Sequence, residues 1–295
     1  MNIGLEYGSH IMELTMSPIY RRWKGLINQM KLELENKTAL VTGGSKGIGK
    51  AIALAFAKEG ANVIICGRGQ EALDEAKKEI EENGGKVLAV RADLSKQEDV
   101  DHLISEAIRQ YNTIDILVNN AGVASGFDDF EALEIEDWQR LFDINLFGTV
   151  RVTKAVIPYM KKAEFGRIIN ISSESGVQPD PFMPHYNASK AALINFTKSL
   201  SKAYADQGIL VNTVSPAFIM TPMLEKLLKD NAEKQNITYE EATQQFLKEN
   251  RPHVEVKRPG TVEEVASAVL FLASGKAGFI NGVNLRVDGG SVASQ

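Results

Sequence analysis

Cysteine is almost absent from this chain of 295 residues. Its single cysteine, Cys66, ends the apolar run 62–66, so no disulfide can form within the chain. We expect the thiol to be a small buried side chain. Histidine is also scarce, and none of the histidines lies at metal-ligand spacing from another histidine or from the cysteine, so we predict no metal site. The four histidines are His10, His102, His185 and His253.

Long apolar runs and a large net charge are missing as well. No run of about 18 apolar residues occurs, so we expect no transmembrane helix and no membrane partner. The formal net charge is only −5, which argues against nucleic acid as a partner. Hydrophobic residues make up 44% of the chain and charged residues 24%, a composition typical of a globular protein with a substantial core.

The first 29 residues differ from the rest. Their basic cluster, Arg21, Arg22 and Lys24, comes late and follows acidic residues, which is unlike a secretory or mitochondrial leader, so we expect a cytoplasmic protein. Residues 1–29 are either an arm that packs on the domain or on a partner subunit, or a stretch upstream of a natural start at Met30. We expect residues 30–295 to form the main domain.

From Lys37 onward, short apolar runs alternate with amphipathic stretches. The near-continuous apolar character of the runs indicates strands buried on both faces. We therefore predict an α/β fold: a single Rossmann-type doubly wound domain whose seven-stranded, mainly parallel sheet carries helices on both faces. The predicted strands are 38–41, 62–66, 86–90, 114–118, 167–171, 209–213 and 284–287. The predicted helices are 48–59, 70–82, 96–111, 136–160, 184–206 and 261–273.

Residues 218–259 interrupt this alternation, because the segment is too long for an ordinary connection. It reads as two helices, and the second opens with Thr238 and Glu241 at the spacing of a capping box. We predict a helical lid near the carboxyl edge of the sheet. A solvated decoration of the domain is the alternative.

A glycine-rich loop follows the first predicted strand and opens the first predicted helix. Gly43, Gly47 and Gly49 let the backbone turn sharply and approach a phosphate at a helix N-terminus. Ser45, Lys46 and Ile48 lie between these glycines. The alternative is a tight turn that binds nothing.

Arg68 follows the second predicted strand, where an acidic residue would bind a free ribose 2′-hydroxyl and an arginine suits a 2′-phosphate. With Lys46 as a second cation nearby, the pattern favours NADP(H) over NAD(H), although NAD(H) stays possible. The alternative is that both are ordinary surface cations.

Tyr186 and Lys190 are four residues apart on one predicted helix and so share a face. An ammonium about 4 Å from a phenol is worth roughly 4 kcal/mol at an effective dielectric of about 20. We therefore expect Lys190 to lower the pKa of Tyr186 into the range of general acid–base catalysis.

Two further polar residues complete a candidate catalytic set. Ser173 follows a predicted strand and can donate to a substrate carbonyl, with Ser172 as the competing choice. Asn145 falls on the apolar face of the helix 136–160, where a buried amide needs partners. It either satisfies backbone groups or holds a water near Lys190.

These residues together resemble the short-chain dehydrogenase/reductase family over about 32–290. The resemblance implies that Asn145, Ser173, Tyr186 and Lys190 are catalytic: Tyr186 exchanges the proton, Ser173 polarises the carbonyl, Lys190 lowers the Tyr186 pKa and bonds the nicotinamide ribose, and Asn145 positions a water. It also implies cofactor contacts at Tyr186 and Lys190 and at further residues. These are Asp93, Leu94, Asn119, Ala121, Gly122, Pro216, Ile219 and Thr221. One departure is Ser215-Pro216-Ala217, where the family usually has Pro-Gly.

The resemblance implies an NADP(H)-dependent oxidoreductase that moves a hydride between nicotinamide and a carbonyl or secondary alcohol. The pattern is similar to 3-oxoacyl-thioester reductases and sugar or polyol dehydrogenases, which are usually homotetramers or homodimers. The polar substrate residues of 3-hydroxybutyrate dehydrogenases are not evident, since 123–126 and 174–176 read Val-Ala-Ser-Gly and Glu-Ser-Gly. An NAD(H)-dependent polyol or hydroxy-acid dehydrogenase is the alternative, and a non-catalytic nucleotide-binding regulator is a remote one.

Overall fold

A seven-stranded sheet lies at the centre of the unit formed by Leu34–Gln295. The computed structural model describes residues 31–124 and 129–293, so the predicted arm at 1–29 and part of the 123–126 segment lie outside the described residues. The strand order is β3-β2-β1-β4-β5-β6-β9, and every neighbouring pair is parallel. The strands are β1 Thr38–Thr42, β2 Asn62–Gly67, β3 Lys86–Arg91, β4 Ile116–Asn119, β5 Gly166–Ile171, β6 Ile209–Pro216 and β9 Asn284–Val287.

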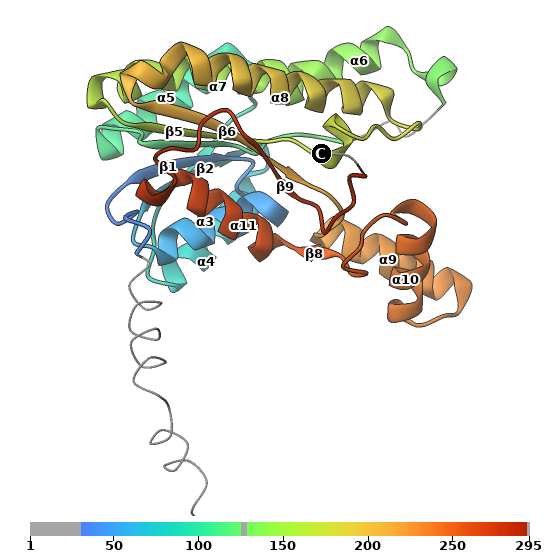
Figure 1. Ribbon diagram of the computed structural model, residues 1–295. Coiled ribbons are helices and arrows are strands. Elements are labelled where there is room, and N and C mark those ends of the chain that lie inside the picture. Colours follow the sequence, from blue (N-terminus) through green and yellow to red (C-terminus); the bar gives the residue numbers. More distant parts are fainter. Residues whose placement is uncertain (1–30, 125–128, 294–295) are drawn as a thin grey trace, which may run out of the picture. The chain divides into compact units, whose positions relative to one another are not determined.

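Helices cover both faces of this sheet (Figure 1). One layer contains α5 (Gln97–Tyr111), α7 (Gly148–Ala163) and α8 (Pro184–Tyr204), and the opposite layer contains α3 (Gly47–Lys58), α4 (Gln70–Glu82) and α11 (Val262–Ala273). Apolar side chains of α5 and α7 pack with those of β1, β2 and β4 in one buried cluster. The predicted doubly wound α/β fold is confirmed, and the sheet is entirely parallel rather than mainly so.

The single long helix predicted at 136–160 is wrong in one respect. The chain forms α6 (Ile135–Phe142), then a π-helical turn η2 (Asp143–Phe147), then α7. Thr149 Oγ1 donates to the carbonyl oxygen of Asn145 at 3.3 Å, and the Asn145 side chain bonds the backbone of Val123. Such turns often mark functional positions, and an apolar period that continues through them does not reveal them in a sequence.

The predicted helical insertion at 218–259 is confirmed as two helices, α9 (Pro222–Gln235) and α10 (Tyr239–Asn250). The capping box of Thr238 and Glu241 is present, with each side chain bonded to the backbone of the other residue. A short parallel pair, β7 (Ile219–Met220) and β8 (Gly260–Thr261), joins the two ends of the insertion. Phe218 stacks on Phe246 with ring centroids 4.9 Å apart, so the insertion has a small hydrophobic cluster of its own.

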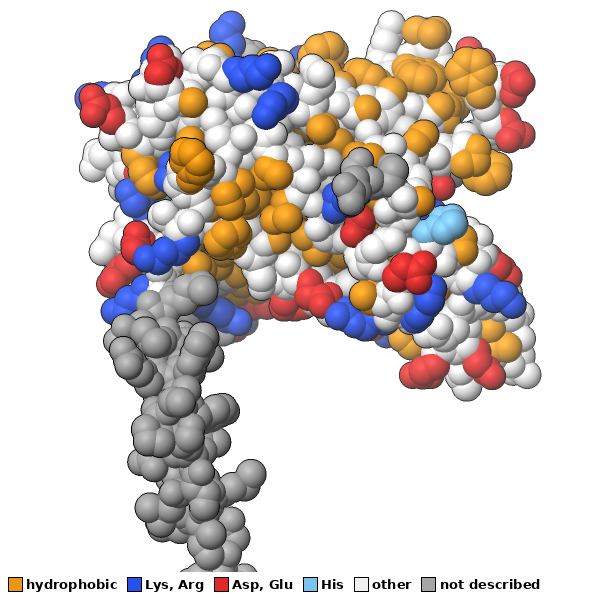
Figure 2. Space-filling model, in the orientation of Figure 1, with side chains coloured by type: hydrophobic (Ala, Val, Ile, Leu, Met, Phe, Trp, Pro, Cys, Tyr) orange, Lys and Arg blue, Asp and Glu red, His pale blue; other side chains and the backbone are white. Residues whose placement is uncertain are grey.

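Short helical turns occur in the connections. They are the 3-10 turns η1 Phe130–Ala132, η3 Glu174–Gly176, η4 Ala205–Gln207 and η5 Gly275–Ala277. On the face drawn in Figure 2, basic and acidic side chains are interspersed, also over α9 and α10. Within residues 31–124 and 129–293, no helix is long and apolar enough to cross a membrane.

Candidate active site

The glycine-rich loop connects β1 to α3 and lies at the carboxyl edge of the sheet. Gly43 and Gly47 have φ values of +64° and +54°, which favour glycine. A side chain at Gly49 would collide with the carbonyl oxygen of Gly43, so the loop can close only around a glycine there. Asn120, which sequence reasoning did not single out, fastens the loop by donating to the carbonyl oxygens of Thr42 and Gly43 at 3.0 and 3.2 Å.

A cavity of about 180 Å³ opens beside this loop. It brings together seven of the predicted cofactor contacts from four strand ends: Gly43, Ser45, Arg68, Asp93, Leu94, Ala121 and Gly122. Cys66, Ser95, Val123 and Ile144 also line it. A cavity built from the first glycine of the loop and the ends of β2, β3 and β4 matches a crevice for a nucleotide at the carboxyl ends of parallel strands.

Charge in this cavity comes from one arginine and one aspartate. Arg68 is exposed at the end of β2. Burial opposes the ionisation of Asp93, but hydrogen bonds from Ser95 and the charges of Arg68 and Lys96 lower its pKa overall. Arg91 lies beside Arg68, outside the described lining of the cavity, and its Nε donates to the carbonyl oxygen of Arg68 at 3.1 Å. Sequence reasoning missed Arg91, although its place at the end of β3 was a usable signal.

The remaining predicted cofactor contacts are outside the lining of this cavity, as far as the described residues extend. Lys46 is exposed at the N-terminus of α3, with Gly47, Ile48 and Gly49 following in the helix. Asn119 is buried, and its amide donates to Thr153 and Asn170. Pro216 ends β6, Ile219 begins β7 and Thr221 caps α9.

Thr221 and Gly47 face each other at a second cavity. A Cβ at Gly47 would lie 3.7 Å from Thr221 Cγ2. Both residues line a space of about 440 Å³ between α3, α9 and α11. The insertion therefore begins directly against the glycine-rich loop.

Tyr186 and Lys190 lie on the same face of α8, as predicted, with Lys190 Nζ 5.6 Å from the centre of the tyrosine ring. The ammonium donates to the carbonyl oxygen of Ile171 at 3.0 Å. Burial lowers the pKa of Lys190 to about 8. This lysine therefore sits close to its titration point at physiological pH.

The expected lowering of the Tyr186 pKa by Lys190 is not what the structure gives. The pKa of Tyr186 is raised, chiefly because burial disfavours the phenolate, while a hydrogen bond with Ser173 lowers it. The Lys190 ammonium donates to the carbonyl oxygen of Ile171. The sequence spacing places the two side chains on one face but does not determine where the ammonium points.

The two candidate serines have different partners. Ser172 Oγ donates to the carbonyl oxygen of Lys190 at 2.9 Å and is therefore engaged in holding β5 against α8. Ser173 is hydrogen-bonded to Tyr186, and its Oγ accepts from the backbone N–H of Ser175 at 3.2 Å. Of the two, only Ser173 lies against the tyrosine.

Asn145 is buried, with a relative exposure of 1%. Its amide exchanges two hydrogen bonds with the backbone of Val123, at 2.8 and 2.9 Å. A Cβ built on Gly122 would lie 3.3 Å from Asn145 Oδ1 and 3.4 Å from Lys190 Nζ. Because Gly122 also lines the smaller cavity, the nucleotide crevice meets the catalytic candidates at this glycine.

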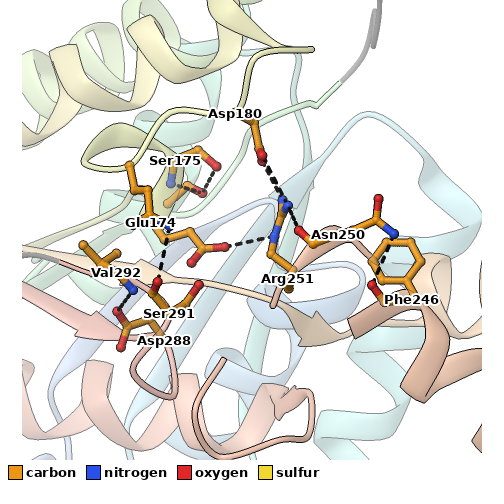
Figure 3. Close-up of polar contacts among 11 residues, drawn as sticks. Glu174, Ser175, Asp180, Phe246, Asn250, Arg251, Asp288, Ser291 and Val292 are labelled. Carbon is orange, nitrogen blue, oxygen red and sulfur yellow. Dashed lines mark hydrogen bonds and ion pairs between the residues drawn. The ribbon is translucent and has the colours of Figure 1, made fainter. Parts of the chain in front are cut away.

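Sequence reasoning missed an ion-pair network beside Ser173 (Figure 3). Arg251, just after α10, lies 3.1 Å from Glu174 Oε1 and 2.7 Å from Asp180 Oδ2. Burial raises the pKa of Glu174, which the Arg251 charge and a hydrogen bond with Ser291 oppose. No local sequence signal joins positions 71 or more residues apart.

The residues present fit a dinucleotide. Backbone is exposed to the cavity at Gly43 and Gly122, where a Cβ would approach Ala121, Asn145 or Lys190 within about 3.4 Å. Positive charge lies at Arg68, near the helix N-terminus of α3, as phosphate groups require. The buried Lys190 ammonium then borders the far end of the crevice.

Comparisons with known proteins agree with this geometry. The sequence profile of the short chain dehydrogenase family matches residues 37–232. A 3-oxoacyl-[acyl-carrier-protein] reductase of Synechocystis is 41% identical over 88% of this chain and 98% of its own length. An uncharacterized oxidoreductase of Bacillus subtilis, YvaG, is 39% identical over 90% of this chain and 99% of its own. The crystal structure of L-sorbose reductase from Gluconobacter frateurii with NADPH and L-sorbose superposes with a TM-score of 0.84 and 34% identity, covering 90% of this chain and 100% of that one.

Proposed function

The chain belongs to the short-chain dehydrogenase family and is an oxidoreductase, and we propose that Tyr186, Ser173, Lys190 and Asn145 are its catalytic residues. In this proposal it moves a hydride between NADP(H) and a carbonyl or secondary alcohol carbon. The observation that carries the proposal is the meeting of the nucleotide crevice with the buried Lys190 ammonium at Gly122.

NADP(H), when bound, supplies or accepts the hydride. In the proposal, Arg68 and Arg91 bind the 2′-phosphate, and the glycine-rich loop with Ser45 and Lys46 approaches the pyrophosphate. Asp93 and Leu94 border the adenine side of the cavity. The NADPH bound in the sorbose reductase structure supports the same choice of cofactor for this chain.

Tyr186 acts as the acid in reduction. Its raised pKa keeps the phenol protonated at neutral pH, so it carries the proton that the alkoxide oxygen needs. Ser173, hydrogen-bonded to the phenol, can donate to the same carbonyl oxygen and stabilise developing negative charge there. In the oxidative direction Tyr186 must first be ionised, because only the phenolate can accept the alcohol proton, and the raised pKa of Tyr186 disfavours that form at neutral pH.

Lys190 and Asn145 support this pair. The buried Lys190 ammonium offers a hydrogen-bond donor at the border of the crevice, where a nicotinamide ribose would lie. The Asn145 side chain is hydrogen-bonded to the backbone of Val123. Its Oδ1 and the Lys190 ammonium both lie next to Gly122, where the Oδ1 can also accept a hydrogen bond from a water. In the proposal, the proton that Tyr186 gives to the substrate is replaced by way of this water and Lys190.

The test is a calorimetric titration of the protein with NADPH and NADH, followed by turnover of a panel of ketones and alcohols with the tighter cofactor. Tighter binding of NADPH and reduction of ketones support the proposal. Tighter binding of NADH points to an oxidative polyol or hydroxy-acid dehydrogenase. Binding of neither points to a protein without this activity.

Three finer features belong to the proposal. We take residues 30–295 as the oxidoreductase domain and 1–29 as an arm. A homotetramer or homodimer is supported by the half-exposed Phe147, the last residue of the turn η2 that also contains Asn145, and light scattering tests it. A cytoplasmic location is supported by the single, fully buried Cys66, which needs no oxidising compartment, and cell fractionation tests it.

A further inference from the structure

Three segments far apart in the sequence converge on the carboxylate of Glu174 (Figure 3). The first is the loop from Ser172 to Asp180, which contains η3. The second begins at Arg251, where α10 ends, and the third is the loop 288–293 after β9. Ser291 hydrogen-bonds to the Glu174 side chain, and Gln178 accepts from the backbone N–H of Ala293 at 3.0 Å.

Arg251 is the link to the helical insertion. Its backbone N–H donates to the carbonyl oxygen of Leu247 at 2.8 Å, so its side chain departs from the last turn of α10. Its Nε contacts Glu174, while its Nη2 donates to Asp180 at 2.7 Å. A planar guanidinium with two carboxylates is a geometrically specific contact, unlike an exposed pair of flexible charges.

Glu174 transmits this contact to the active site through the backbone. Its carbonyl oxygen accepts from the N–H groups of Val177 and Gln178, both at 2.8 Å, so the residue is part of a tight turn. Ser173 is its direct neighbour and is hydrogen-bonded to Tyr186. The Glu174 carboxylate and the Ser173 hydroxyl are thus carried by adjacent residues of one hydrogen-bonded turn.

We propose that Arg251 is a positioning residue: it holds Glu174, and through the η3 turn it fixes the Ser173 hydroxyl against Tyr186. Because Ser173 matters for a reaction only if the enzyme acts on a carbonyl or alcohol, this inference rests on the proposed function. In this proposal, efficient turnover requires that the segment after α10 stays packed against the η3 turn through Arg251.

The charges of the pair support this role. Burial is the main cause of the raised pKa of Tyr186, and Glu174 raises that pKa further while Arg251 lowers it. The two charges thus act on the phenol in opposite directions. With Arg251 in place, Tyr186 is shielded from the nearby carboxylate.

The experiment compares Arg251→Met and Glu174→Gln with the double variant and with Arg251→Lys. Arg258→Met is the matched control, since Arg258 also forms a two-point pair, with Glu264 at 2.6 and 2.9 Å, but is exposed and apart from Ser173. For each variant, NADPH affinity, kcat and KM for a reducible ketone, and amide hydrogen exchange are measured.

Arg251→Met is expected to lower kcat on the order of 10- to 100-fold, the cost of misplacing a catalytic group. NADPH affinity stays within about twofold, because Arg251 and Glu174 do not line the described part of the nucleotide cavity. The double variant falls no further than Arg251→Met, since both residues act through one contact. Arg251→Lys restores part of the loss, and Arg258→Met keeps the kcat of the unaltered enzyme.

Hydrogen exchange tests the coupling independently of activity. Arg251→Met is expected to speed exchange both in α10 and at the amides of Gly176, Val177 and Gln178, which are hydrogen-bonded within the turn. Normal kcat in Arg251→Met, or faster exchange confined to α10, overturns the proposal. If the unaltered protein reduces no ketone, the proposed function fails, and the exchange at 176–178 still decides whether Arg251 holds the turn.

Discussion

Lys190 on α8 donates from Nζ to the carbonyl oxygen of Ile171, the last residue of β5, at 3.0 Å. The same ammonium lies 5.6 Å from the centre of the Tyr186 ring. The ammonium that is proposed to support the reaction is therefore hydrogen-bonded to the end of β5 and not to the phenol oxygen. Its protonation state then follows from burial.

The pH dependence of reduction follows from this placement. Burial lowers the pKa of Lys190 to about 8, whereas the pKa of Tyr186 is raised, so Lys190 is the first of the two to lose its proton as pH rises. We expect kcat/KM for ketone reduction to fall as pH rises through about 8. A profile that stays flat to about pH 10, near the ordinary lysine value, contradicts this assignment.

The proposed function assigns the choice between NADPH and NADH to Arg68. Arg68→Asp replaces a cation of the nucleotide cavity with an anion, which in this proposal repels a 2′-phosphate and can bind a free hydroxyl. We expect the ratio of NADPH to NADH affinity to fall by at least about tenfold, equal to about 1.4 kcal/mol. The matched control is Lys96→Asp, which changes the same charge at the N-terminus of α5, outside the described lining of the cavity. Equal shifts in the two variants would show a general effect of charge.

Variants of the two adjacent serines distinguish a residue that polarises the substrate carbonyl from a residue that only stabilises the fold. Ser173→Ala is expected to lower kcat on the order of 10²- to 10³-fold, as removal of one oxyanion donor does, with little change in stability. Ser172→Ala removes a buried hydrogen bond to the Lys190 carbonyl oxygen, which keeps its backbone bond within α8, and is expected to lower the free energy of unfolding by about 0.5–1.5 kcal/mol. Kinetics and denaturant unfolding of both variants check the pair. The reverse pattern assigns the catalytic role to Ser172.

The capping boxes of α10 and α11 allow the stability of the insertion to be compared with that of the core. Thr238 caps α10 and Thr261 caps α11, each with a glutamate three residues on. We expect either alanine variant to cost about 1 kcal/mol locally. Thr261→Ala is expected to lower global stability, because α11 packs on the sheet, whereas Thr238→Ala speeds hydrogen exchange in α10 and leaves global unfolding nearly unchanged. Equal losses of global stability contradict a separately opening insertion.

Much of the fold follows from local patterns in the sequence. The helix at 70–82 and the strand at 284–287 have the predicted bounds, because amphipathic periods and glycine stops act within a few residues. The capping box at Thr238 is also a local signal and is present as predicted. The π turn at Asn145 does not follow from nearby sequence alone, because it is accompanied by hydrogen bonds between the Asn145 side chain and the backbone of Val123, 22 residues away.

The electrostatics of the site depend on directions and distances that sequence spacing does not contain. Tyr186 and Lys190 share a face as predicted, but the direction of the ammonium depends on where the end of β5 lies. Arg251 meets Glu174 only because the insertion folds back onto the turn after β5. Such contacts between distant segments require the tertiary structure.

Tyr186→Phe tests the central claim most directly. The phenyl ring keeps the packing on α8 but carries no proton, so NADPH binding is expected to match the unaltered enzyme. Turnover of a ketone that the unaltered enzyme reduces is expected to fall on the order of 10²- to 10⁴-fold, the usual worth of general acid catalysis. Measured by NADPH consumption, undiminished reduction of that ketone by Tyr186→Phe would contradict the role of Tyr186 as the proton donor.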